Sequence, residues 1–225
     1  MTAAYSVFPN AGVRKQAYII ERIDDANHKP IYLAAHISTP ALDPGAAWMT
    51  SQLMEEVLTR GTAASARYSL GFRLPAAGKT GTTNDYKDAW FLGYTSTLTC
   101  GVWVGFDQPT TIISRGYGAA LALPVWTQVM NKAAQHYPAD PLQPTMPLQH
   151  ATVCSISNQL ATTGCASAGT AYDIDLPADK VPTVACEVHG GQQMPFAQQL
   201  QGLPQKAATL PNRFFRSFRK LFGGR

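Results

Sequence analysis

Two apolar runs constrain the fold more strongly than any other feature of the chain. They are DAWFLGYTS, which begins at Asp88, and LTCGVWVGFD, which ends at Asp107. Both are rich in aromatic and β-branched residues and too apolar to be exposed on both faces, so we predict two adjacent strands of a covered sheet, joined by a tight turn near Ser96. A third strand is expected just upstream, at about Ala76–Thr82.

The sequence also predicts two helices that can cover this sheet, and a β-hairpin. Residues 42–63 (LDPGAAWMTSQLMEEVLTRGTA) carry apolar residues at helical spacing and end in a glycine-containing segment. A second helix is predicted in LALPVWTQVMNKAAQHY, starting around Leu121 to Pro124. Two β-prone runs, residues 17–25 and 30–35, are separated by DANHK and predict a hairpin.

Composition divides the chain into four parts. Residues 1–137 have the patterning of a packed domain, and residues 138–150 form a Pro-rich linker. Residues 151–190 hold three of the four cysteines in a small, loop-rich lobe. Residues 191–225 are a Gln- and Pro-rich segment followed by a basic tail.

The net charge of +4 is unevenly distributed. The last fifteen residues carry five basic side chains and no acid, which leaves a net charge of −1 on the rest of the chain. A nearly neutral body excludes a basic nucleic-acid-binding surface, so we expect no nucleic-acid partner. The tail can form a basic amphipathic helix that contacts a membrane surface, and a disordered basic tail is the equal alternative.

The segment PAAGKTGTTNDYKDAWFLGY contains the motif that points to chemistry. Its Lys-Thr-Gly triplet alone is weak, since a surface lysine at a turn would look the same. Here, however, the triplet lies on a predicted strand, with small residues before it and hydroxyls after it. Small flanks let a ligand backbone lie along a strand edge, and an ammonium with neighbouring hydroxyls suits a peptide carboxylate bound by strand addition.

The wider pattern GTAASAR, then PAAGKTGTTNDYKDAWFLGY, then CGVWVGFD resembles the C-terminal part of the transpeptidase domain of class A penicillin-binding proteins. These are bifunctional enzymes that polymerise and cross-link peptidoglycan. The resemblance covers about residues 1–135 and includes MTAAYSVFPNAG and GYGAALALPVW. It implies an α/β fold of the α+β type, with an antiparallel sheet packed on helices.

The resemblance also assigns roles. It implies that Lys79 supports the electrostatics of the site, that Thr80 and Thr82 hold the substrate carboxylate, and that the Thr82 N–H forms half of an oxyanion hole. Gly81 would leave room for the acyl group. The predicted substrate-binding residues are Lys79, Thr80, Gly81, Thr82 and Thr83.

The other two family motifs are missing. S-x-N does not occur, and S-x-x-K occurs once, at Ser217 to Lys220, far downstream of Lys79 and in the basic tail. We therefore expect a fragment that carries the substrate strand without the nucleophile and is inactive alone, with no cofactor. A non-catalytic module that binds cell-wall peptides is the alternative. Serine β-lactamases share the strand motif, but the DYKDAWFLGY continuation favours the synthase.

The resemblance implies that the full-length protein lies outside the cytoplasm, anchored to the inner membrane, and that it binds stem peptides and β-lactams. The chain itself shows no signal peptide and no apolar run long enough to span a membrane. An oxidising compartment favours a disulfide, and we predict that Cys154 pairs with Cys165. No metal is assigned. Two alternatives remain: a zinc site made of Cys154, Cys165, Cys186 and His189, or free thiols. Cys100 is expected to be a buried strand residue.

Overall fold

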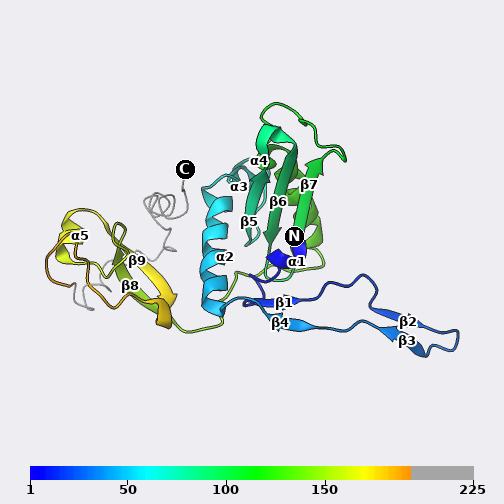
Figure 1. Ribbon diagram of the computed structural model, residues 1–225, viewed down its shortest axis with the longest axis horizontal. Coiled ribbons are helices and arrows are strands. Elements are labelled where there is room, and N and C mark those ends of the chain that lie inside the picture. The colour runs from blue at the N-terminus through cyan, green and yellow to red at the C-terminus, as the bar shows by residue number, and fades with distance from the viewer. Residues whose placement is uncertain (194–225) are drawn as a thin grey trace. The chain divides into compact units, whose positions relative to one another are not determined.

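Three antiparallel strands in the order β5-β6-β7 form the main sheet of the protein (Figure 1). They span Ala77–Thr82, Asp88–Tyr94 and Thr99–Gly105. The computed structural model describes residues 1–193. The chain divides into two compact units, Met1–Thr145 and Met146–Arg225, and the sheet belongs to the first. All three strands predicted from the sequence, and their antiparallel arrangement, are confirmed.

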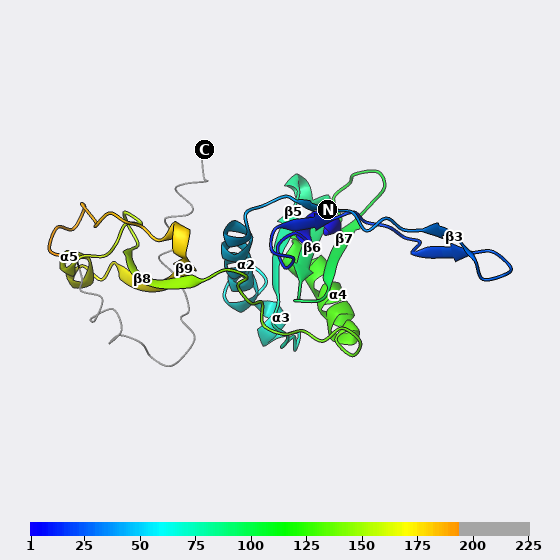
Figure 2. The ribbon, with the colours of Figure 1, turned by 90° about the horizontal axis from the view of Figure 1, so that it is seen from below.

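Helix α2 spans Pro44–Thr59 and packs beside β5 (Figures 1 and 2). The Asp43 carboxylate precedes it and accepts a hydrogen bond from the Ala46 N–H at 3.0 Å. Proline at the first helical position needs no N–H partner, so this start is encoded locally. The helix predicted from residues 42–63 is therefore confirmed. A short helix α3, Ser65–Tyr68, follows it.

Helix α4 spans Gly118–Ala133 and packs against β6 and β7. The predicted start around Leu121 to Pro124 is wrong, because the helix begins at Gly118 and contains Pro124 in its interior. The Gly118 N–H donates to Thr82 Oγ1 at 3.1 Å, which gives the first turn a partner on β5. A hydrogen bond between residues so far apart in the sequence cannot be predicted from the local pattern.

The core of the first unit is centred on Trp126, which is fully buried on α4. Its ring centroid lies 4.8 Å from that of Phe91 and 5.0 Å from that of Phe72. Its indole N–H donates to the Cys100 carbonyl at 3.2 Å, so the one polar atom of the side chain is satisfied. Cys100 itself is half-buried on β7. The other large core residues are Leu58, Leu123 and Met130.

An extended arm leaves this core near the N-terminus (Figure 1). Helix α1, Thr2–Tyr5, leads into strand β1, Val13–Lys15, which pairs with β4, Ser38–Pro40. Further along the arm, β2 and β3 pair antiparallel, which confirms the predicted hairpin. These two strands span Arg22–Asp24 and Pro30–Leu33.

The second unit contains a two-stranded antiparallel sheet of β8, Leu148–Cys154, and β9, Ala171–Pro177. Helix α5, Thr163–Ser167, lies between them in the sequence. The division between the units, after Thr145, falls inside the range 138–150 that the sequence assigns to a linker, and β8 begins there as well. Two single turns of 3₁₀-helix, Asn84–Tyr86 and Ala178–Lys180, complete the elements.

Within residues 1–193, no helix is both long and apolar enough to cross a membrane. The predicted basic amphipathic tail and the Ser217 to Lys220 motif lie outside the described residues.

Truncating the buried indole should destabilise the first unit far more than truncating an exposed one. We expect Trp126→Ala to lower the free energy of unfolding by about 3–5 kcal/mol, because it removes apolar contacts and leaves a cavity. Trp103→Ala is the matched control, since Trp103 is 43% exposed and should cost less than about 1.5 kcal/mol. Urea denaturation followed by circular dichroism measures both. Equal losses would contradict this description of the core.

Candidate functional site

The exposed half of β5 is where the predicted site residues lie. Ala77 and Gly78 are buried, whereas Lys79 and Thr82 are exposed. Within the described part of the chain, β5 pairs with β6 and has no strand on its other side. The strand is therefore a sheet edge, which is the geometry that strand addition by a peptide needs.

The exposed half of β5 presents two N–H groups away from β6. The Thr83 N–H donates to the Asp88 carbonyl of β6 at 3.1 Å. Because N–H groups along an antiparallel edge strand point alternately toward and away from the neighbour, those of Thr82 and Thr80 point to the opposite edge. The Thr82 N–H thus has the direction that an oxyanion donor on this strand requires.

Lys79 carries the positive charge of the site. Its Nζ donates to the Thr80 carbonyl at 2.9 Å and lies 3.4 Å from Thr80 Oγ1. Within residues 1–193 its ammonium makes no ion pair with a carboxylate. The charge is thus available to an anionic ligand at the exposed end of the strand.

The threonine hydroxyls have separate partners. Thr82 Oγ1 accepts a hydrogen bond from the Gly118 N–H at 3.1 Å. Its own O–H can therefore rotate to donate to another group. The Thr83 hydroxyl donates to Asp88 Oδ2 at 3.1 Å and accepts from the Asp88 N–H at 2.8 Å. Thr83 therefore closes the turn into β6, and its hydroxyl is less available to a ligand than that of Thr82.

Two features of the site were not predicted. Thr62 Oγ1 lies 3.0 Å from Thr80 Oγ1, so a hydroxyl from the segment after α2 joins the strand. The hydroxyls of Tyr86 and Tyr117 lie 3.1 Å apart, and this hydrogen bond raises the pKa of Tyr86. Thr62 belongs to the GTAASAR segment, so the pattern that carries the family resemblance contained this residue without indicating its contact.

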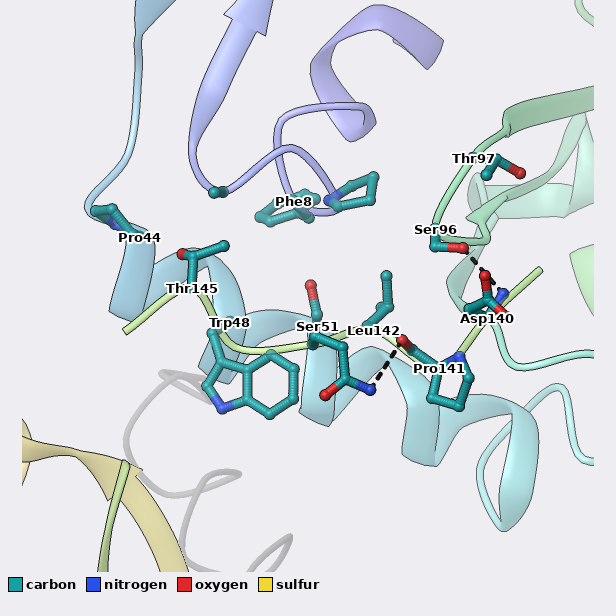
Figure 3. A pocket seen from close by; sticks show the side chains of 13 residues that line it. Phe8, Pro44, Trp48, Ser51, Ser96, Thr97, Asp140, Pro141, Leu142 and Thr145 are labelled. Carbon is teal, nitrogen blue, oxygen red and sulfur yellow. Dashed lines mark hydrogen bonds between the residues drawn. The ribbon is translucent and has the colours of Figure 1, made fainter. Parts of the chain in front are cut away.

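A cavity of about 320 Å³ lies in the first unit at the other end of the sheet (Figure 3). Phe8 and Trp48 line it, together with the Ser96 turn and the Pro-rich segment, whose Asp140 N–H donates to Ser96 Oγ at 3.1 Å. Asp140 is the one titratable side chain among its lining residues. With no second acid or base nearby in the lining, this cavity is a poor place for acid–base chemistry, and the exposed half of β5 is the better candidate site.

The second unit contains the cysteines for which a disulfide was predicted. The predicted Cys154–Cys165 disulfide stays a prediction, since the sulfurs of both residues are unlinked in this structure. Their sulfurs instead lie 3.4 and 3.6 Å from the same atom, His189 Nδ1. The four residues named in the zinc alternative, Cys154, Cys165, Cys186 and His189, are thus the ones that the fold brings together.

Comparisons with known proteins agree on the family. Residues 1–131 match the family described as "Penicillin binding protein transpeptidase domain". The chain is 41% identical over 141 residues to penicillin-binding protein 1A of Neisseria lactamica, covering 60% of this chain and 17% of that protein. It is 32% identical over 189 residues to penicillin-binding protein 1A of Pseudomonas aeruginosa, covering 61% of this chain and 23% of that protein.

The fold has a match among solved structures. The crystal structure of penicillin-binding protein 1A from Haemophilus influenzae superimposes with a TM-score of 0.67 at 22% identity, covering 82% of this chain and 32% of that chain. At this identity the match supports the fold alone. The chain spans about a fifth of the length of the curated relatives it matches.

The contact between α4 and the end of β5 leads to a prediction about Gly118. A Cβ atom at this position would lie 2.2 Å from the Trp90 carbonyl oxygen and 2.7 Å from that of Gly81. Because both obstacles are backbone, Gly118→Ala should lower the free energy of unfolding by about 1–3 kcal/mol. It should also shift the Thr82 amide resonance in a nitrogen–proton NMR spectrum.

Gly101→Ala is the control for this prediction. A Cβ there would meet the hydroxyl of Thr2, a side chain that can rotate away, so we expect a smaller loss and no change at Thr82. A Gly118→Ala chain as stable as the parent would show that α4 does not hold the end of β5.

Proposed function

Because the chain belongs to the penicillin-binding protein transpeptidase family, we propose that β5 is the strand on which a peptidoglycan D,D-transpeptidase aligns its stem peptide. In this proposal the peptide lies along the exposed half of β5, and its terminal carboxylate meets the ammonium and hydroxyls there. β-Lactams, which mimic the peptide terminus, would occupy the same strand. The site belongs to a cell-wall enzyme whose domain lies outside the cytoplasm.

One observation carries the proposal. The Lys79-Thr80-Gly81 motif lies on an exposed sheet edge, with the Lys79 Nζ 3.4 Å from Thr80 Oγ1 and without an ion pair among the described residues. A surface lysine at a turn, the alternative for this motif, would have neither the open edge nor the neighbouring hydroxyl. The arrangement suits a carboxylate at the end of an extended peptide.

Each residue then has a task. Lys79 attracts the carboxylate and stabilises negative charge in the site, and the hydroxyls of Thr80 and Thr82 donate hydrogen bonds to it. The Thr82 N–H, directed away from β6, stabilises the oxyanion formed when the scissile carbonyl is attacked. Gly81, without a side chain, leaves room for the acyl group; separately, a Cβ at this position would lie 3.1 Å from Trp90 Cβ on β6.

The nucleophile is assigned to a longer polypeptide. The family's acylated serine lies before the Lys-Thr-Gly strand, and no S-x-x-K motif precedes Lys79 in these 225 residues. We therefore propose that acylation takes place when this strand is combined with a segment that carries the serine. The 225-residue chain alone should give no covalent band with a fluorescent penicillin after denaturing electrophoresis.

A chimera tests the function directly. Residues 1–131 of this chain would replace the matching segment of the N. lactamica relative, which is 41% identical, and the rate of acylation by a fluorescent penicillin would be measured. We expect the chimera to be acylated. Lys79→Ala in the chimera should slow acylation by about 10²–10³, as expected for removal of one electrostatic stabiliser of the oxyanion.

Lys87→Ala is the matched control. Lys87 lies 3.7 Å from Asp85 in an exposed ion pair beyond the strand, and its loss should leave the acylation rate unchanged. A folded chimera, shown by its melting transition, in which Lys79→Ala is acylated as fast as the parent would overturn the role given to Lys79. A folded chimera that binds stem peptide without being acylated would favour the non-catalytic binding module.

A further inference from the structure

Four side chains that can bind a metal converge inside the second unit. They are Cys154, Cys165, Cys186 and His189, and their ligand atoms all lie within 4.8 Å of one another. The three cysteines are buried and the histidine is partly buried. Cys154 ends β8, Cys165 lies on α5, and the other two belong to the segment after β9.

The distances around the histidine do not fit hydrogen bonding. His189 Nδ1 lies 3.4, 3.6 and 3.5 Å from the sulfurs of Cys154, Cys165 and Cys186. An imidazole nitrogen has either one N–H or one lone pair in the ring plane, so it can form one good hydrogen bond and not three. Three nearly equal contacts to one nitrogen therefore need another explanation.

A tetrahedral zinc ion explains the distances. Zn–S bonds are about 2.3 Å and Zn–N bonds about 2.0–2.1 Å, so tetrahedral angles place a sulfur and a nitrogen ligand roughly 3.5–3.6 Å apart. The three observed distances, from 3.4 to 3.6 Å, match this value. The 4.8 Å limit also leaves room for the sulfur–sulfur separation of roughly 3.8 Å in the same geometry.

The backbone around the cluster is built for close approach. Gly164 precedes Cys165, and a Cβ at Gly164 would lie 2.1 Å from the carbonyl oxygen of His189. Glycine thus lets α5 pack directly on the loop that carries the histidine. The Cys186 N–H donates to the Leu160 carbonyl at 2.8 Å, which fixes that segment against the rest of the unit.

Further polar groups lie against the sulfurs. The Ile156 N–H points at Cys154 Sγ at 3.4 Å, and the Thr162 hydroxyl lies 3.3 Å from Cys165 Sγ. Such donors stabilise the negative charge of a thiolate, and thiolates are the form in which cysteines bind metals. The cluster therefore contains four candidate ligands and, around their sulfurs, hydrogen-bond donors of the kind found around bound metals.

We infer that Cys154, Cys165, Cys186 and His189 form a structural zinc site that holds the second unit together. Four protein ligands leave no open position for a substrate, which is the pattern of a structural site and not of a catalytic one. The described part of the unit needs such a cross-link, because its buried apolar cluster consists of these three cysteines and Ala161. Soft thiolates with one imidazole select zinc over magnesium or calcium.

Metal content and a spectroscopic probe test the site. The 225-residue chain would be refolded under reducing conditions with one equivalent of zinc sulfate and dialysed, and its zinc measured by mass spectrometry. We expect one zinc per chain. Replacing zinc with Co²⁺ should give the intense visible bands of a tetrahedral thiolate complex. Iron or copper in place of zinc, or no bound metal with all thiols reduced, would overturn the site.

Variants separate ligation from general damage to the fold. His189→Ala should weaken zinc affinity by at least about tenfold, since even an outer-shell partner is worth about 10–100-fold. His189→Cys should retain zinc, because four cysteines also form a structural site, and its Co²⁺ spectrum should change toward that of four thiolates. Cys100→Ser is the control, since Cys100 lies on β7 outside the cluster.

The opposite results are equally clear. A His189→Ala chain that binds zinc as tightly as the parent would exclude ligation by residue 189. A zinc-free chain whose non-reduced peptides show Cys154 linked to Cys165 would restore the disulfide predicted from the sequence and overturn the zinc site.

Discussion

The antiparallel pairing of β5 with β6 is the constraint on which the candidate site depends. It places Lys79 opposite Leu92 and Thr80 opposite Phe91. Phe91 packs on Trp126 of α4, so Thr80 starts from that face of the sheet and Lys79 from the other, and the Lys79 Nζ reaches around the exposed edge to within 3.4 Å of Thr80 Oγ1. A slip of one residue would exchange the two faces and bury an ammonium against aromatic rings. The register is therefore held by the core, and the chemistry of the edge follows from it.

Helix α4 connects the core to the site. Trp126 anchors the middle of the helix under the sheet, while the Gly118 N–H at its start bonds to Thr82. The same helix thus fixes the sheet and the hydroxyl at the end of β5. In the proposed function this support holds the N–H groups of β5 in place for a peptide, which reduces the ordering that binding would otherwise cost.

The sequence predicted those parts of the fold that local patterns encode. The strands β5 to β7 followed from apolar runs, and α2 from its periodicity and the Asp43-Pro44 start. The start of α4 was missed because Gly118 bonds to a residue 36 positions away. Spacing left a disulfide and a zinc site as alternatives for the cysteines, because the approach of His189 to the thiols depends on the close packing at Gly164. Lys79 and its neighbours were predicted from a motif, whereas the Thr62 contact with Thr80 depends on packing and was not predicted.

The central claim is that the exposed half of β5 receives the end of a stem peptide. Titration of the nitrogen-15-labelled chain with an acyl-D-alanyl-D-alanine peptide, followed by NMR, tests it most directly. The account predicts amide shifts concentrated at Thr80–Thr83, reduced in Lys79→Ala and retained in Lys87→Ala. Shifts gathered at the cavity lined by Trp48 and Ser96, with none on β5, would contradict it.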